Sequence, residues 1–175
     1  MNARSNAQLK DRRDMAEIDA DLFRGALGCF ASGVTIVTTL RDGAPAGTTV
    51  SAFSALSMDP PLVLVSMDRG SNTLAAIRDA GFFGVNILSA EQAGIARKFA
   101  SSKGGPKFEG VDWQSEVTGA PLFAENSSTI DCALEMVHDG GDHEILVGRV
   151  LFVDCPGETE PLLYFKSAFR ELVSS

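Results

Sequence analysis

The stretch around which the chain is organised reads Gly47-Thr-Thr-Val-Ser-Ala-Phe-Ser-Ala-Leu-Ser-Met-Asp-Pro-Pro-Leu62. It opens with β-branched residues, as strands often do, and then continues into small residues. It stops at Pro60-Pro61, where backbone donors are lost and φ is fixed. Five hydroxyl side chains lie between Thr48 and Ser57. Such a segment suits a flat, polar, anionic ligand, and it equally suits a strand that leads into a solvated, serine-rich loop.

The composition is typical of a soluble globular protein with a single domain. The chain has 175 residues, of which 45% are hydrophobic and 22% are charged. A net charge of −8 disfavours a nucleic-acid-binding surface, because an acidic protein repels phosphates. No apolar run reaches the length of a membrane span, and the charged N-terminus lacks the apolar core of a secretory signal. We therefore expect a protein that binds neither nucleic acid nor membrane.

The cysteines indicate the redox compartment. Cys29, Cys132 and Cys155 are odd in number, far apart and without CxxC spacing. This pattern favours a reducing, cytoplasmic location over a disulfide framework or a structural zinc site.

The hydrophobic pattern predicts a mainly β fold with flanking helices, in which consecutive antiparallel strands form hairpins. We expect a flexible N-terminal segment at residues 1–17 and one domain at residues 18–175. Within the domain, strands are expected at residues 34–40, 62–67, 82–88, 128–138, 143–153 and 162–165. Arg41-Asp42-Gly43-Ala44 predicts a hairpin from the first of these into a further strand. The strand at 62–67 is continuously apolar, which predicts burial on both faces. Helices are expected at 18–30, at 74–79 with Gly81 ending it, at 90–100 and at 167–172, and a long, glycine-rich excursion at 101–126.

Several common catalytic motifs do not occur in the sequence. No GxGxxG follows a predicted strand and no GxxxxGK[ST] is present, which disfavours a Rossmann dinucleotide site and a P-loop. HExxH and GxSxG are also absent, so the sequence gives no support to a zincin or an α/β-hydrolase.

Asp142-His143-Glu144 has the composition of a metal cluster. In an extended segment, however, Asp142 and Glu144 point to one face and His143 to the other. We therefore expect no metal site there. A lone histidine beside a Gly-Gly turn is typical of a hairpin end, but a histidine that faces a ligand could donate a hydrogen bond to a phosphate or a carboxamide.

Ser71-Asn72-Thr73 precedes a predicted helix and also has two interpretations. Ser71 or Asn72 can serve as the N-cap, which needs no ligand. Alternatively, the unpaired amides of the helix N-terminus and the two hydroxyls could form a phosphate seat.

A set of motifs distributed along the chain resembles one known family. The motifs are Phe30-Ala-Ser-Gly-Val-Thr-Ile-Val-Thr-Thr39, the stretch from Gly47 to Ser57, Asp59-Pro-Pro-Leu62, Ser71-Asn-Thr73, Phe83-Gly-Val-Asn-Ile-Leu88, Lys107-Phe108, Gly141-Asp-His143 and Pro161-Leu-Leu-Tyr-Phe165. In this order and spacing, residues 23–172 resemble the short-chain flavin reductases that supply reduced flavin to two-component monooxygenases. The resemblance implies an FMN-binding split β-barrel of Greek-key antiparallel type, a homodimer, FMN or FAD as the flavin, NADH or NADPH as the reductant, and a partner monooxygenase.

The resemblance also implies a set of site residues. The flavin ring would lie against Thr48, Thr49, Val50 and Ser51, near the backbone of Val34 and Thr35, with Ser54 and Ala55 in a turn at the ribityl chain. The phosphate end would be surrounded by Ser66, Met67, Asp68, Ser71 and Thr73 and covered by Phe99 and Lys103. Phe165 and Phe169 would lie by the ring, from the same subunit or from the neighbouring one. His143 would be the catalytic residue on the nicotinamide side. At position 169 many relatives have a tyrosine, so a hydroxyl contact is missing there.

This interpretation is chemically coherent, since a flavin performs hydride chemistry itself and the protein mainly orients the reactants. A chain without a nucleophile, a metal cluster or paired catalytic carboxylates can therefore still be an enzyme. Two other classes remain open: a non-catalytic flavin- or haem-binding split-barrel protein or electron carrier, and a purely structural dimer module. The sequence leaves FMN against FAD and NADH against NADPH undecided.

Overall fold

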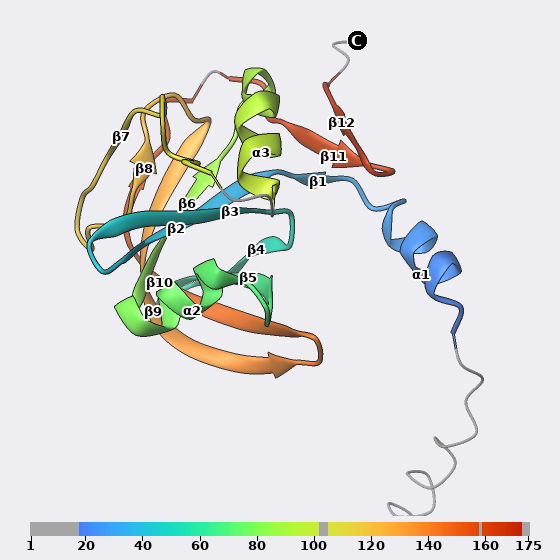
Figure 1. Cartoon of the computed structure of the whole chain (residues 1–175), viewed down its shortest axis with the longest axis horizontal. Coiled ribbons are helices and arrows are strands. Elements are labelled where there is room, and N and C mark those ends of the chain that lie inside the picture. The colour runs from blue at the N-terminus through green and yellow to red at the C-terminus, as the bar shows by residue number, and fades with distance from the viewer. Residues whose placement is uncertain (1–17, 102–104, 158, 173–175) are drawn as a thin grey trace, which may run out of the picture.

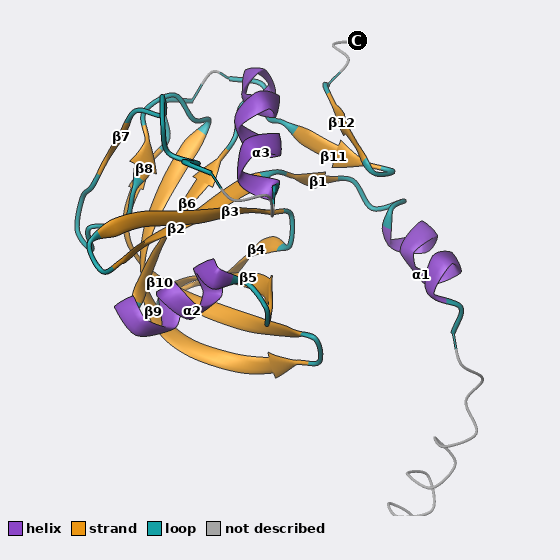
Figure 2. Cartoon of the chain, viewed as in Figure 1, coloured by secondary structure: helices purple, strands orange, loops and turns teal. Residues whose placement is uncertain are grey.

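The computed structural model describes residues 18–101, 105–157 and 159–172. The N-terminal segment predicted at residues 1–17 lies outside these ranges. Figure 1 shows a barrel of strands with helices at its margins, and Figure 2 shows how strongly strands dominate the described chain. The helices are α1 (Ala20–Leu27), α2 (Asn72–Ala80), the short 3-10 helix η2 (Ala90–Gln92) and α3 (Ala93–Ala100). Within these ranges, no helix has the length and apolar character that a bilayer crossing needs.

The main sheet has seven strands in the order β3-β2-β6-β9-β10-β5-β4, and the pairings described along it are antiparallel. Its members are β2 (Thr35–Arg41), β3 (Ala44–Val50), β4 (Phe53–Met58), β5 (Pro61–Asp68), β6 (Phe82–Ile87), β9 (Ser128–Gly140) and β10 (His143–Asp154). A small sheet joins β1 (Ser32–Gly33), β11 (Leu163–Phe165) and β12 (Ala168–Arg170), and a hairpin joins β7 (Trp113–Gln114) to β8 (Leu122–Phe123).

Two tight turns set the register of the hairpins. The β2–β3 turn places Asp42 at φ 51 and Gly43 at φ 78, and the β9–β10 turn places Gly141 at φ 80. Positive φ at a turn is accessible to glycine at little cost, which explains the Asp-Gly and Gly-Gly pairs in the sequence. The second turn positions His143 directly opposite Asp68 of β5.

The barrel is incompletely closed between β3 and β5. At one end of the sheet, β3 pairs only with β2 among the described strands. The pairing of β4 with β5 begins at Val65, so Ser66, Met67 and Asp68 extend beyond it. The Ser66 N–H donates to the Ala52 carbonyl at 2.9 Å and bridges the gap. We call the gap between these two strand segments the split.

Two apolar clusters hold the fold together. The first fills the barrel with buried side chains from β2, β3, β5, β6, β9, β10 and α2, among them Val65, Phe83 and Leu146. The second packs α3 against β2 and β8 through Phe99 and Phe123, whose ring centroids are 5.5 Å apart. Burial of this apolar surface is the main stabilising contribution, at about 25 cal/mol per Å².

Helix α1 does not share in this core. None of its residues is buried, and Leu22, Phe23 and Leu27 on it are exposed, as is Phe30 beyond its end. Figure 1 shows α1 beside the small sheet and away from the barrel. Its Asp19 N-cap accepts a hydrogen bond from Leu22 N–H at 2.8 Å, so the helix is well capped despite having little to pack against.

The predicted fold class is confirmed, with three local corrections. The tail predicted as a helix at 167–172 contains strand β12, because it pairs with β11. Ser54 and Ala55 lie within strand β4 rather than in a turn or a loop, since pairing with β5 overrides the weak strand propensity of small residues. Strand β5 is buried on one face only: Val63, Val65 and Met67 are buried, and the residues between them are partly exposed.

Candidate flavin site

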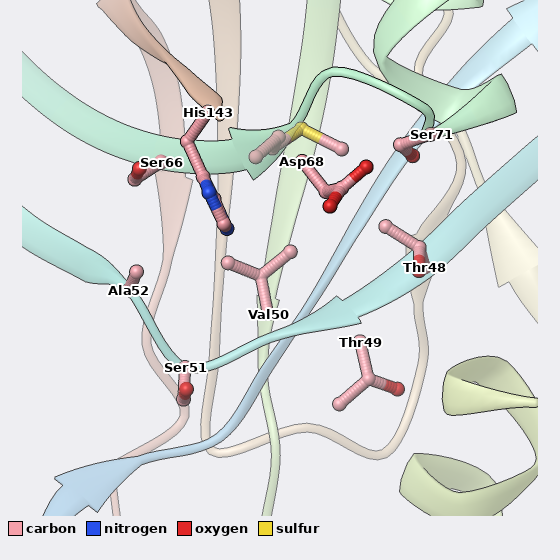
Figure 3. Close-up of a pocket in the computed structure, with 10 residues that line it drawn as sticks. Thr48, Thr49, Val50, Ser51, Ala52, Ser66, Asp68, Ser71 and His143 are labelled. Atoms are coloured by element: carbon pink, nitrogen blue, oxygen red, sulfur yellow. The ribbon is translucent and has the colours of Figure 1, made fainter. Parts of the chain in front are cut away.

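A pocket occupies the split between β3 and β5. Its volume is about 230 Å³. Figure 3 shows the side chains that surround it. The residues that line it are Thr48, Thr49, Val50, Ser51, Ala52, Ser66, Met67, Asp68, Ser71 and His143. We call this cavity the split pocket. Apart from Ala52, all of these residues belong to the set that the sequence singled out.

The alternation of β3 determines which side chains face the split pocket. Thr48 and Val50 point from β3 toward β5, whereas Thr49 points to the other side of the strand (Figure 3). There, the Thr49 hydroxyl donates to the Ala96 carbonyl of α3 at 2.7 Å. Thr49 thus offers a ligand its backbone rather than its hydroxyl. The main-chain groups on the open edge of β3 add donors and acceptors, because an edge strand leaves half of them unpaired.

One end of the split pocket is suited to an anion. Ser71 caps α2, its hydroxyl accepting a hydrogen bond from Leu74 N–H at 3.4 Å, so the N-cap interpretation is confirmed. Thr48 and Ser71 approach each other at this end in Figure 3. A helix N-terminus flanked by hydroxyls is the kind of place at which proteins bind phosphates. The first two residues of α2, Asn72 and Thr73, line the next cavity along β3. Asp68 lies beside them, and its carboxylate accepts a hydrogen bond from Gly70 N–H at 2.6 Å.

His143 extends from the start of β10 into the split pocket, toward Val50 (Figure 3). Its Nδ1 lies 2.8 Å from a carboxylate oxygen of Asp142. The hydrogen bond and the charge interaction with His143 lower the pKa of Asp142. With Nδ1 engaged, Nε2 is the ring nitrogen that remains available to a ligand.

Glu144 does not join His143 in a metal cluster. Its carboxylate is paired with Arg69 at 2.8 Å and with Arg78 at 2.7 Å, on the other face of the strand. Within the described ranges, no group of three or more His, Cys, Asp or Glu side chains is placed to hold a metal ion.

Two residues predicted to lie near the flavin ring, Val34 and Thr35, form their hydrogen bonds with other residues of the protein. Val34 is in the core, its N–H donating to Leu162 and its carbonyl accepting from Leu88. The Thr35 hydroxyl donates to the Val50 carbonyl at 2.7 Å and is buried. Thr35 therefore supports the end of β3, and neither residue lines the split pocket.

The predicted covering of the phosphate end is different in the structure. Phe99 is fully buried against Phe108 and Phe123, so its ring is a core residue that does not face the split pocket. It also packs so closely on β3 that a Cβ at Gly47 would lie 3.0 Å from it. Lys103 lies outside the described residues.

A second cavity of about 440 Å³ continues along β3 beyond Thr48. Pro45, Gly47, Thr73 and Lys107 contribute to its lining, which places the predicted Thr73 here and not in the split pocket. The Lys107 ammonium donates to the Phe99 carbonyl at 2.8 Å, and burial lowers the pKa of Lys107.

The remaining predicted residues lie on the other flank of the split pocket. Ser54 lines a groove of about 600 Å³ that shares Ser51, Ala52 and Ser66 with the split pocket. Ala55 lies one position further along β4 and lines neither cavity.

Phe165 and Phe169 belong to the small sheet and do not line the split pocket. Phe169 packs under Arg97 of α3, with 5.0 Å from the guanidinium carbon to the ring centroid, and beside Tyr164.

Three residues that line the split pocket or the adjoining groove were not predicted from the sequence: Ala52, Tyr164 and Lys166. Ala52 was noticed only as a small residue, although its place in the central stretch was a usable signal. Tyr164 and Lys166, which line the groove, gave no such signal, because their proximity to β4 depends on how the tail folds back.

The fold and the split pocket define a split-barrel protein with a polar pocket between β3 and β5. A family model described as "Flavin reductase like domain" matches residues 27–173. The chain belongs to this family and is an NAD(P)H-dependent flavin reductase, so the resemblance inferred from the motifs is confirmed.

Individual relatives agree with this assignment. HsaB, a flavin-dependent monooxygenase reductase subunit of Rhodococcus jostii (strain RHA1), is 43% identical over 152 residues, covering 87% of this chain and 77% of HsaB. SmoA of Agrobacterium fabrum, an FMN reductase (NADH), is 37% identical, covering 84% of this chain and 83% of SmoA. Among solved structures, the NADH:FAD oxidoreductase SgcE6 of Streptomyces globisporus, in complex with NAD and FAD fragments, superposes with a TM-score of 0.84 at 32% identity, covering 90% of this chain and 98% of SgcE6.

Proposed function

We propose that the protein transfers a hydride from NADH to FMN or FAD seated in the split pocket, and that the reduced flavin serves a partner monooxygenase. The observation that carries this proposal is the convergence of hydroxyls, open strand edges and His143 on one cavity. A bound flavin supplies the redox chemistry, because its ring accepts the hydride. The names of HsaB and SmoA support the partner and the reductant.

The residues of the split pocket fit this group by the chemistry of their donors. Backbone groups at Thr49 and Val50 and the Ser51 hydroxyl would hold the ring and favour negative charge on it. Thr48, Ser71 and the α2 amides would hold the phosphate. His143 would bind the nicotinamide carboxamide through Nε2 and so orient the donor over the ring.

The role of His143 is tested by anaerobic stopped-flow reduction of FMN and of FAD with NADH and with NADPH. We expect His143→Ala to slow hydride transfer by about tenfold or more, with the flavin Kd changed less than about threefold. His138→Ala is the matched control, since His138 lies on β9 opposite Ile145 and outside the split pocket. A wild-type protein that holds its flavin tightly and never turns over free flavin would instead be an electron carrier.

We further propose that the protein is a homodimer. Its exposed apolar helix α1 and the groove beside the split pocket, which Leu27 and Phe30 help to line, would be covered by a second copy. The groove shares residues with the split pocket, so the second copy would also form part of the wall around the flavin.

The three free cysteines favour a reducing, cytoplasmic location, which cell fractionation would test.

A further inference from the structure

Arg69 joins the two segments that bring polar groups to the split pocket. One is the loop from Asp68 to Ser71, to which Arg69 belongs, and the other is the turn that precedes His143. The Arg69 N–H donates to the Asp142 carbonyl at 3.1 Å, and its Nε donates to the Gly141 carbonyl at 2.7 Å. A single residue thus links the anion end of the pocket to the turn that carries the histidine.

Carboxylates hold the Arg69 guanidinium in place. One terminal nitrogen pairs with Glu144 at 2.8 Å and the other with Asp139 at 2.5 Å. The Glu144 side chain is 9% exposed and the Arg69 side chain 43%, so solvent screens this pair only in part. Asp139 also accepts a hydrogen bond from Gly141 N–H at 3.0 Å, and this bond together with Arg69 lowers the pKa of Asp139. The planar guanidinium is therefore held in one orientation by charge-assisted hydrogen bonds.

We propose that Arg69 is a positioning residue for His143, fixing the turn from Gly141 to His143 relative to the loop from Asp68 to Ser71. The inference rests on the proposed function of His143. Arg69 is not among the residues that line the split pocket, so it acts on the reaction through the turn and not on the ligand. A displacement of about 1 Å between reacting groups can lower the rate about a hundredfold. A residue that fixes the turn before His143 can therefore affect the rate of hydride transfer.

Arg78 provides a matched control. Its guanidinium reaches the same carboxylate, Glu144, at 2.8 and 2.7 Å, but it comes from α2, and its described hydrogen bonds all end on Glu144. Arg69→Ala and Arg78→Ala each leave Glu144 with one guanidinium. Only Arg69→Ala also removes the side-chain bonds to the Gly141 carbonyl and to Asp139, while the main-chain bond to the Asp142 carbonyl remains.

The test measures single-turnover hydride transfer from NADH to flavin, together with the flavin Kd, in the two variants, in His143→Ala and in the Arg69→Ala/His143→Ala double variant. We expect Arg69→Ala to slow hydride transfer by about tenfold, Arg78→Ala by less than about twofold, and the flavin Kd to change less than about threefold. In the His143→Ala background, Arg69→Ala should add less than about twofold, because a residue that acts through another loses its effect when the other is absent.

Two results would overturn the proposal: equal losses in Arg69→Ala and Arg78→Ala, or additive losses in the double variant. A His143→Ala protein with the wild-type rate would contradict the proposed function of His143 itself, a distinguishable failure. If Arg69→Ala does not fold, Arg69→Lys replaces it, since it keeps the charge beside Glu144 but loses the planar fork. A wild-type rate in Arg69→Lys would then contradict the proposed positioning role of Arg69.

Discussion

Cys132 lies on β9 within the barrel core and is fully buried. Burial, and secondarily the neighbouring Asp131 carboxylate, raise the pKa of this thiol from 9.0 to about 12. Between these two values the unfolded chain releases the thiol proton and the native protein keeps it. Rising pH therefore favours the unfolded state, and this contribution to stability is lost above pH 9.

We expect the difference in free energy of unfolding between the wild type and Cys132→Ala to shrink by about 1.4 kcal/mol between pH 8 and pH 10. Urea unfolding of both proteins at several pH values measures this difference. Cys29 and Cys155 are exposed in both proteins, so their ionisation cancels in the comparison. A difference that does not vary with pH would show that the Cys132 thiol titrates alike in the folded and unfolded states.

At the scale of elements, Asp131 ties the long excursion before β9 to the barrel. Its fully buried carboxylate accepts hydrogen bonds from Val117 N–H at 2.9 Å, from Thr118 N–H at 2.8 Å, and from the Thr118 hydroxyl. This anchor adds to the apolar contacts that the excursion makes through Phe108, Leu122 and Phe123. The anchor lies outside the split pocket.

We expect Asp131→Ala to lower the free energy of unfolding by about 3 kcal/mol, since it leaves two backbone donors without their acceptor. Asp131→Asn keeps one carbonyl oxygen and should lose about half as much. Chemical denaturation measures both variants, and flavin titration should give unchanged Kd values. A weakened flavin affinity would show that the excursion contributes to the site.

The elements that the sequence predicted well are those with strong local signals. The Asp42-Gly43 hairpin and the Ser71-capped, Gly81-terminated helix α2 were predicted from short motifs, and the structure confirms them. Strand β12 was missed because nothing local in residues 167–172 reveals that they pair with β11.

The residues of the candidate site show the same difference between local signals and long-range contacts. Neighbours in sequence such as Thr48 to Ser51 were placed together correctly. The packing of Phe99 against Phe108 and Phe123 and the pairing of Arg69 with Glu144 depend on contacts between distant segments, which the sequence does not reveal.

At the scale of the molecule, the proposed dimer can be tested by substituting an exposed apolar residue of α1. Leu27 is exposed on α1 and lines the groove, whereas Leu151 is exposed on β10 and does not. We expect Leu27→Asp to convert a wild-type dimer into a monomer in sedimentation equilibrium, because a buried, unpaired carboxylate costs several kcal/mol. Leu151→Asp should remain a dimer.

Flavin binding measured on the same samples tests whether dimerisation affects the flavin site. If the second copy walls the split pocket, the monomeric Leu27→Asp protein should bind flavin at least about tenfold more weakly. A wild-type protein that sediments as a monomer at micromolar concentration would contradict the dimer, and α1 would then be an uncovered surface.

If flavin occupies the gap between β3 and β5, as we propose, the stability of the protein depends on the concentration of free flavin. A strand that fully sealed the barrel would stabilise it permanently, whereas an exchangeable occupant does so only while present. At a free flavin concentration a hundred times the Kd, occupancy adds about 2.7 kcal/mol to the native state. Because cellular proteases remove the unfolded fraction, a flavin-starved cell would clear this reductase faster than a replete one.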